Sequence, residues 1–334
     1  LSSAPPFYRI DSAHQTIEPH PPLTDADWDT VFDVMKEHGL IGISSSALTD
    51  SAMQRLSRLG FVTRVNVGGA RALTDDGLLH LANMQQLEEL DLSGYHSPLT
   101  DRGLYVLRHL KSLRRFHMCW PQRITDAGTV HLKNCNDLES VNLMGTHTGD
   151  GTVNVLRGKP RLRNLTTGRL LTDAGVVHLH DFPVFKTWHG GEARYGLMSF
   201  GGEPNNLLLD GPITDQGLAG LVGLDGVSAL GFFWHALAFT GQGLAVLTQL
   251  PHLGMLGCQG DRCNDEAMQS IAMLPSLRML MAQGTVASDD GFVALSRSQT
   301  LEYIWGRECP NLHSRGFAAL ANLPALRGLG VSCL

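Results

Sequence analysis

The segment HLHDFPVFKTWHGGE, residues 178–192, gathers the residue types that bind zinc through imidazole nitrogens and carboxylate oxygens. The candidate ligands are His178, His180, Asp181, His189 and Glu192. However, His178 stands at the same place in a repeated motif as His80 and His131, six residues after a threonine. His178 is therefore a residue of the repeat on its helical side, whereas His189 is expected on a strand at the opposite face. The sequence predicts no metal site here.

The cysteines predict neither a zinc site nor a disulfide scaffold. Cys258 and Cys263, in CQGDRC, have no second close pair with which to bind zinc, and six cysteines in 334 residues do not make a disulfide scaffold. Free thiols slightly favour the cytoplasm. Localisation stays open, because a targeting sequence can have been removed before Leu1.

Catalytic motifs are absent from the sequence. It contains no nucleophile elbow, Walker loop, dinucleotide-binding fingerprint or HExxH. Paired acids such as Asp75–Asp76 and Asp289–Asp290 stand at expected helix starts, where they complement the helix dipole. The sequence therefore predicts no catalysis by this chain and no cofactor.

Composition and charge exclude two further classes of protein. Apolar residues make up 43% of the chain and charged residues 17%, which is typical of globular proteins. A net charge of −6 argues against a general nucleic-acid binder, which needs a basic surface. No stretch approaches 18 consecutive apolar residues, so no membrane span is predicted.

A turn motif close to LTDxGL returns about every 25 residues. It begins at Thr24, Thr49, Thr74, Thr100, Thr125, Thr148, Thr172, Thr214 and Thr240, with weaker versions at Asn264, Ser288 and His313. An apolar or aromatic residue follows 16 or 17 positions later, as from Thr49 to Val65. Threonine suits a helix N-cap, the apolar residues three apart suit one helix face, and the closing LxL alternation suits a strand. Each unit is therefore turn, helix and strand.

This pattern resembles the leucine-rich repeats, in particular the ITDxGLxxL…LxxLxL type of cysteine-containing repeats and many bacterial repeat proteins. The resemblance covers about residues 23–334. It implies an α/β solenoid, a horseshoe of about 13 repeats with a parallel β-sheet on the concave face and short helices on the convex face. One departure is that the Asn or Cys expected after LxL is missing, and Gly94, Gly145, Gly260 and Gly284 stand near that place.

One interval breaks the period, since 42 residues separate Thr172 from Thr214. Trp188 falls where a strand centre is due, and NNLLLDG offers a second LxL at Leu207 and Leu209. We interpret residues 189–213 as one short irregular repeat, with Leu197, Met198 and Phe200 in the core. The alternative is a protruding functional loop.

The two ends differ from the repeats. Residues 1–22 are proline-rich and expected to be extended. Residues 23–334 form one solenoid domain, with a first helix at 25–38 as the N-terminal cap. The sequence finishes on a strand without a polar cap, so we expect that edge to pair with a second copy or a flanking domain.

The residues on either side of each strand centre must point away from the core. In the first half of the chain these columns are polar, and in the second half they carry methionine and aromatic residues, which are enriched in protein interfaces. The predicted partner-binding residues are Arg64, Arg115, His117, His189, Phe233, Trp234, Met255, Met279, Met281, Tyr303 and Trp305. The alternative is that neighbouring side chains in a curved solenoid simply cover one another.

The sequence thus predicts a protein- or peptide-binding or scaffolding module that uses its concave face. Two other hypotheses stay open. One is a carbohydrate-binding protein of the cell envelope that stacks sugars on Trp120, Trp234 and Trp305. The other is a recruiting domain of a larger protein or enzyme. Fold alone does not decide among them.

Overall fold

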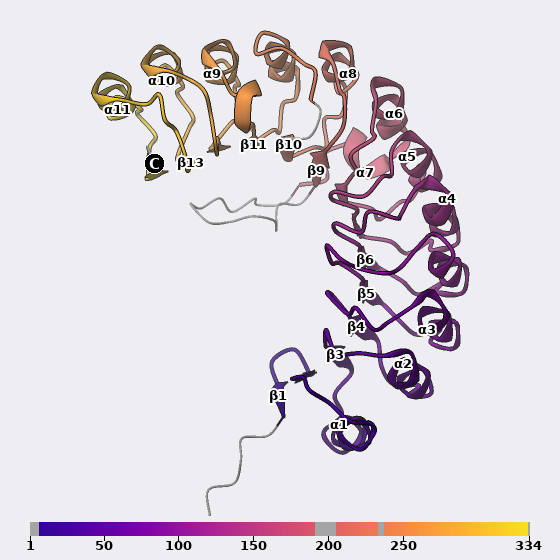
Figure 1. Cartoon of the computed structure of the whole chain (residues 1–334). Helices are drawn as coiled ribbons and strands as arrows, with labels where there is room; N and C mark the ends of the chain where they lie inside the picture. Colours follow the sequence, from indigo (N-terminus) through magenta and orange to yellow (C-terminus); the bar gives the residue numbers. More distant parts are fainter. Residues whose placement is uncertain (1–6, 191–204, 233–236, 333–334) are drawn as a thin grey trace, which may run out of the picture. The chain divides into compact units, whose positions relative to one another are not determined.

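The computed structural model describes residues 7–190, 205–232 and 237–332. The chain divides into two compact units, Leu1–Leu162 and Arg163–Leu334, which we describe separately as unit 1 and unit 2. In each unit the strands form one layer and the helices another (Figure 1). The face of each sheet that points away from its helices is called the sheet face.

Unit 1 begins with a β-hairpin and a long helix. Strands β1 (Tyr8–Asp11) and β2 (Thr16–Pro19) pair antiparallel, and α1 (Asp25–His38) follows. The parallel strands after them are β3 (Gly42–Ser44), β4 (Arg64–Asn66), β5 (Glu89–Asp91), β6 (Arg115–His117) and β7 (Ser140–Asn142), each paired with the one before. The helices between them are α2 (Asp50–Leu56), α3 (Asp75–Leu79), η1 (His80–Asn83), η2 (Gly103–His109), α4 (Asp126–Thr129), η3 (Val130–Asn134) and α5 (Asp150–Leu156).

Unit 2 continues the same alternation. Its parallel strands are β8 (Asn164–Thr166), β9 (Asn206–Leu209), β10 (Ala229–Phe232), β11 (Met255–Gly257), β12 (Met279–Met281), β13 (Tyr303–Gly306) and β14 (Gly328–Val331). Its helices are α6 (Asp173–Val177), η4 (His178–Asp181), α7 (Pro183–Lys186), α8 (Asp215–Ala219), η5 (Gly243–Gln249), η6 (Gly260–Arg262), α9 (Asp265–Ala272), α10 (Asp289–Leu295) and α11 (Ser314–Leu320).

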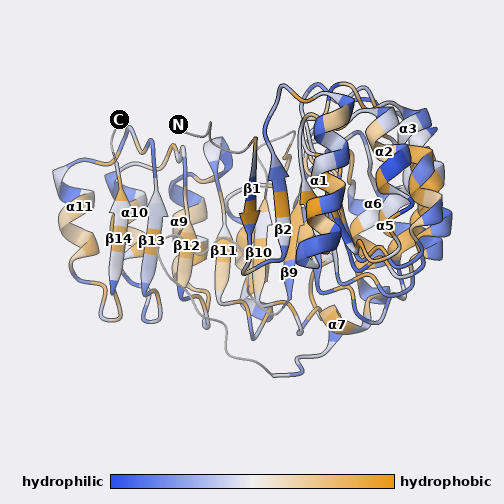
Figure 2. Ribbon diagram, turned by 90° about the horizontal axis from the view of Figure 1, so that it is seen from below, coloured by the Kyte–Doolittle hydropathy of each residue, from blue (hydrophilic) through white to orange (hydrophobic). Residues whose placement is uncertain are grey.

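The apolar period of the sequence explains the core. The strand centres Val65, Leu90 and Phe116 are buried between sheet and helices, as is the helix residue Leu104. Threonine caps α1, α2, α3, α4, α6 and α8 as expected; at α2 the Thr49 side chain accepts a hydrogen bond from the backbone N–H of Ala52 at 3.2 Å. The cap position of α5 is Gly149, so the threonine expected there, Thr148, does not cap the helix. In Figure 2 the helices carry hydrophobic and hydrophilic residues, whereas β12 is hydrophobic along its length.

The N-terminal hairpin is a feature that the sequence analysis did not predict. The proline-rich segment folds back on itself between Tyr8 and Pro19, and β2 pairs in parallel with β3. The repeat period, counted 17 residues on from Thr24, predicts a strand centre at Ile41; the strand is centred instead on Ile43, which pairs with Val65. The helix before it runs to His38 and ends at Gly39 in the left-handed conformation, so the chain turns toward the sheet later than the repeat period indicates.

Between Thr172 and Thr214 the described residues contain one strand, β9, where two were predicted. Strand β8 pairs directly with β9, with Leu165 opposite Leu207. The strand predicted at Leu207 is confirmed, and the one predicted at Trp188 is wrong. The chain makes a helical turn, α7, before that point, and the Trp188 ring stacks on His252 with centroids 4.9 Å apart.

The described residues between Thr172 and Thr214 therefore belong to one repeat, and the interpretation of residues 189–213 as a separate short repeat is wrong. Leu197, Met198 and Phe200 lie outside the described residues, so their place in the core stays a prediction. Among the helices of the described ranges, none is both long enough and apolar enough to cross a membrane.

Candidate functional site

The sheet face of unit 1 displays two rows of side chains, one on each side of the buried strand centres. Parallel pairing places Gly42, Arg64, Glu89, Arg115 and Ser140 side by side in the first row. The second row consists of Ser44, Asn66, Asp91, His117 and Asn142. These are the columns that strand alternation predicts to point away from the core.

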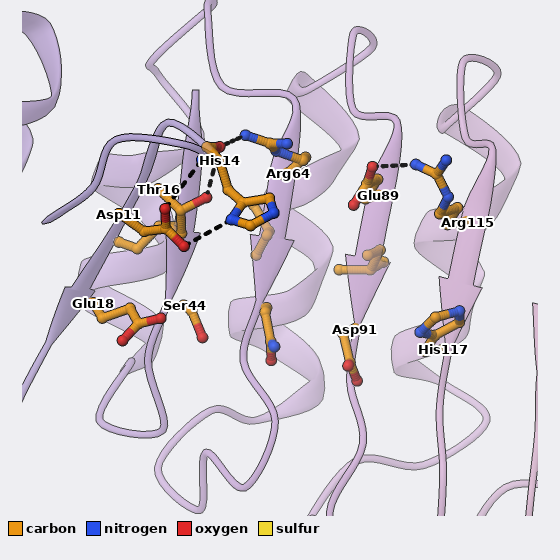
Figure 3. A pocket seen from close by; sticks show the side chains of 14 residues that line it. Asp11, His14, Thr16, Glu18, Ser44, Arg64, Glu89, Asp91, Arg115 and His117 are labelled. Atoms are coloured by element: carbon orange, nitrogen blue, oxygen red, sulfur yellow. Dashed lines mark hydrogen bonds and ion pairs between the residues drawn. The ribbon is translucent and has the colours of Figure 1, made fainter. Parts of the chain in front are cut away.

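A pocket of about 370 Å³ lies on this face, between the N-terminal hairpin and β6 (Figure 3). We call it the sheet-face pocket. Its lining comprises Asp11, His14, Thr16, Glu18, Ile43, Ser44, Arg64, Val65, Asn66, Glu89, Leu90, Asp91, Arg115 and His117. Three of the predicted partner-binding residues, Arg64, Arg115 and His117, are therefore brought together in one concavity. The hairpin residues that complete it were not predicted.

The turn of the hairpin is tied to β4 by a chain of polar contacts. Asp11 Oδ2 lies 2.8 Å from His14 Nδ1, and Asp11 Oδ1 accepts a hydrogen bond from the His14 backbone N–H at 3.1 Å. These hydrogen bonds, that of the side chain first, hold the pKa of the Asp11 carboxyl below its usual value. Arg64 Nη2 donates to the His14 carbonyl oxygen. The hairpin wall of the pocket is therefore fixed by Asp11, His14 and Arg64.

Gly42 makes room for this arrangement. A Cβ added at Gly42 would lie 2.5 Å from Thr16 Oγ1 and 3.3 Å from Arg64 Nε. Only a residue without a side chain lets the arginine and the hairpin approach β3 this closely. Arg64 Nε itself is buried and has no hydrogen-bond partner among the described residues.

The other cations of the pocket are paired with acids. Arg115 Nη1 donates to Glu89 Oε1 on the neighbouring strand. Arg9, at the rim, donates to Glu18 Oε2 from Nε at 3.0 Å and from Nη2 at 2.6 Å. Arg64 and Arg115 were both predicted as partner contacts. In the structure the Arg115 charge is paired with Glu89, whereas Arg64 donates to the neutral carbonyl oxygen of His14.

The second row has a structural role that the sequence analysis missed. Asn66 Oδ1 accepts from the Gly68 backbone N–H at 2.8 Å, and Asp91 Oδ1 accepts from that of Ser93 at 2.8 Å. Asn142 Oδ1 accepts from the Met144 backbone N–H at 3.1 Å. Each closes an Asx turn at the end of its strand. The recurrence of Asn or Asp directly after the strand centre is the signal that would have predicted these turns.

In unit 2 the predicted apolar residues also lie on neighbouring strands. Met279 stands between Met255 and Tyr303, and Met281 stands beside Trp305. Met279 is 0% exposed, so it presents no surface to a partner, whereas the other four are half-buried.

Of the three remaining predicted contacts, the structure describes one. His189 is exposed in the segment after α7 and belongs to no strand. Phe233 and Trp234 lie outside the described residues.

The residues that were considered and rejected as metal ligands are not gathered in the described part of the chain. His180 Nε2 lies 2.8 Å from the carbonyl oxygen of Gly220. Cys258 and Cys263 are fully buried, and the hydrogen bond between their side chains, together with burial, raises the pKa of the Cys258 thiol well above its usual value. Across residues 7–190, 205–232 and 237–332, no three His, Cys, Asp or Glu side chains lie close enough together to hold a metal ion.

The fold of this chain is similar to that of solved structures. The crystal structure of an internalin, InlF, from Listeria monocytogenes is similar over 86% of this chain and 77% of that chain, with a TM-score of 0.50 and 16% sequence identity. This chain has the leucine-rich-repeat fold. A structure of the Rad7 and Elc1 complex in yeast is similar over 92% of this chain and 83% of that chain, with 16% sequence identity and a TM-score of 0.46. No protein-family model and no curated protein sequence matches.

Proposed function

We propose that this leucine-rich-repeat protein binds a protein or peptide partner on its sheet faces and catalyses no reaction of its own. The sheet-face pocket is the observation that carries the proposal. Its floor consists of side chains from consecutive parallel strands, and its wall is the hairpin, so an extended segment laid across the strands meets polar groups at each step. The pocket offers about 370 Å³ for one or two partner side chains.

The half-buried residues of unit 2 provide a second contact area in this proposal. Met255, Met281, Tyr303 and Trp305 combine sulfur and aromatic surface on three adjacent strands. Such residues supply most of the binding energy in protein interfaces when a partner covers them. The sheet face of unit 1 would supply polar contacts and that of unit 2 apolar ones.

Affinity capture with matched variants tests this proposal. We expect a protein retained from the source cells by the native chain to be lost by both Met281→Ala/Trp305→Ala and Glu89→Ala/Arg115→Ala. The control is Met273→Ala/Phe317→Ala, which removes apolar side chains that are 58% and 52% exposed at the helix layer. Capture that survives the sheet-face changes, or that fails only with the control, contradicts the proposal.

A specific observation favours carbohydrate binding as a second candidate function. Tyr95 is 63% exposed, and its ring centroid lies 5.8 Å from that of Trp120, with the planes tilted by 30°. Trp120 adopts a φ of +76° and its ring covers Gly145. Adjacent aromatic rings of this kind can stack on the apolar face of a sugar. A glycan array that shows binding by the native protein and none by Tyr95→Ala would favour this candidate over the first.

A further inference from the structure

Asp91 carries a charge that its turn does not require. Asn66 and Asn142 occupy the same place in neighbouring repeats, and each closes the same turn with an uncharged amide oxygen. One oxygen of Asp91 therefore does what asparagine does elsewhere. The second oxygen and the negative charge are additional to the fold.

The charge of Asp91 also lacks a counter-ion. Three other carboxylates of the sheet-face pocket have a basic partner: Asp11 faces His14, Glu18 faces Arg9 and Glu89 faces Arg115. Within the described part of unit 1, no lysine, arginine or histidine nitrogen lies within ion-pair distance of Asp91. Its neighbours in the row are the amide of Asn66 and the imidazole of His117.

The pocket as a whole is acidic. Asp11, Glu18, Glu89 and Asp91 face two arginines, Arg64 and Arg115, and the histidines His14 and His117. Because Asp11, Glu18 and Glu89 each have a basic partner, Asp91 is the carboxylate of the pocket lining that is left to recognise a cation. Figure 3 shows its carboxylate on the side of the pocket opposite the Glu89–Arg115 pair, next to His117.

We propose that Asp91 recognises a lysine or arginine side chain of a peptide that lies in the sheet-face pocket, a proposal that rests on the peptide-binding function above. The cationic nitrogen donates to the free carboxylate oxygen of Asp91, and its remaining donors face the Asn66 side-chain oxygen and the Ser44 hydroxyl. Hydrogen bonds in which both partners are charged are among the strongest in proteins. Complementary charge of this kind contributes more to the choice of partner than to overall affinity.

The proposal is tested with an array of peptides. Within each set the sequences are identical except at one position, which is Arg, Lys, Gln or Glu. We expect the native protein to bind the Arg and Lys members of a set about tenfold more tightly than the Gln member, which is the size of one charged contact. Asp91→Asn should lose this preference and keep its melting temperature, because asparagine closes the same turn at positions 66 and 142. Asp225→Asn, an exposed acid in unit 2, is the matched control and should behave as the native protein.

A second variant keeps the test informative if Asp91→Asn unfolds. Asn66→Asp adds a carboxylate beside Asp91 while the turn is still closed by an acid oxygen, as it is at Asp91 itself. We expect it to increase the preference for Arg and Lys. If peptides bind but Asp91→Asn keeps the full preference, or Asn66→Asp does not change it, the role of Asp91 is wrong and peptide binding stands. If the native protein binds no member of the array, the proposed function fails with it.

Discussion

The carboxylate of Asp101 reaches into the following repeat and accepts two hydrogen bonds from Thr125. The distances are 2.8 Å from the Thr125 backbone nitrogen and 2.6 Å from Thr125 Oγ1. Thr125 Oγ1 in turn accepts a hydrogen bond from the Ala127 backbone N–H at 3.2 Å, which caps α4. One aspartate thus binds the residue that begins the next helix, so the two repeats are joined at the helix starts.

The same contact recurs in both units. An aspartate accepts the same two hydrogen bonds in five other pairs: Asp50–Thr74, Asp75–Thr100, Asp173–Thr214, Asp215–Thr240 and Asp265–Ser288. It explains the glycine of the LTDxGL motif as well, because a Cβ at Gly128 would lie 2.5 Å from Asp101 Oδ1 and 2.9 Å from Asp101 Cα. The Thr, Asp and Gly of the motif therefore take part in one interaction between neighbouring repeats.

Replacing Gly128 by alanine should destabilise unit 1 by about 2 kcal/mol, because the added methyl group collides with the backbone and carboxylate of Asp101. Urea unfolding followed by circular dichroism measures the change. Gly60→Ala is the control, since a Cβ there meets nothing within 4 Å, and it should change stability by less than about 0.5 kcal/mol. Equal effects of the two changes would contradict the steric explanation.

Removal of the carboxylate itself should have a similar cost. In Asp101→Ala the Thr125 backbone N–H and hydroxyl lose their acceptor, and we expect a loss of about 2 kcal/mol in the free energy of unfolding. Asp225→Ala, at an exposed position, should be close to neutral. Thermal unfolding of both variants compares them directly, and a neutral Asp101→Ala would show that the contact between repeats adds nothing to stability.

The sequence period was enough to predict the repeats. Residues such as Leu90, Phe116 and Leu165 are apolar because they are buried in the core, and they recur at a nearly fixed interval. The period does not encode contacts formed by only one repeat. The pairing of Tyr8–Asp11 with Thr16–Pro19 and the stacking of Trp188 on His252 are of that kind. Likewise, column position placed Arg115 on the sheet face, but its pairing with Glu89 depends on side-chain conformation across two strands.

Arg64 should hold the N-terminal hairpin against the sheet. In Arg64→Ala the His14 carbonyl loses its guanidinium donor, so the hairpin should open more often. We expect about tenfold faster hydrogen exchange at the Gly42 amide, whose N–H donates to the Gln15 carbonyl at 3.1 Å. Arg115→Ala removes an arginine of the same row that contacts Glu89 instead, and should leave this amide unchanged. Equal exchange in both variants would contradict the role of Arg64.

A buried lysine gives unit 1 a pH dependence that can be measured. Lys159 is almost fully buried, its Nζ donates to the Cys135 carbonyl oxygen at 2.7 Å, and burial lowers its pKa from 10.5. In the unfolded chain the Lys159 amine has its ordinary pKa of 10.5 and keeps its proton up to that pH. Between the lowered pKa and 10.5 the unfolded state therefore binds more protons, and stability from this group rises with pH.

The native protein should consequently gain stability relative to Lys159→Met as the pH is raised from 7 toward 10.5. Urea unfolding of both proteins at a series of pH values gives the difference in free energy, from which the titration of all other groups cancels. Lys111→Met, at an exposed lysine, should show a difference that does not change with pH. A constant difference for Lys159→Met would mean that the amine has the same pKa in the folded and unfolded chains, and that water reaches it despite its burial.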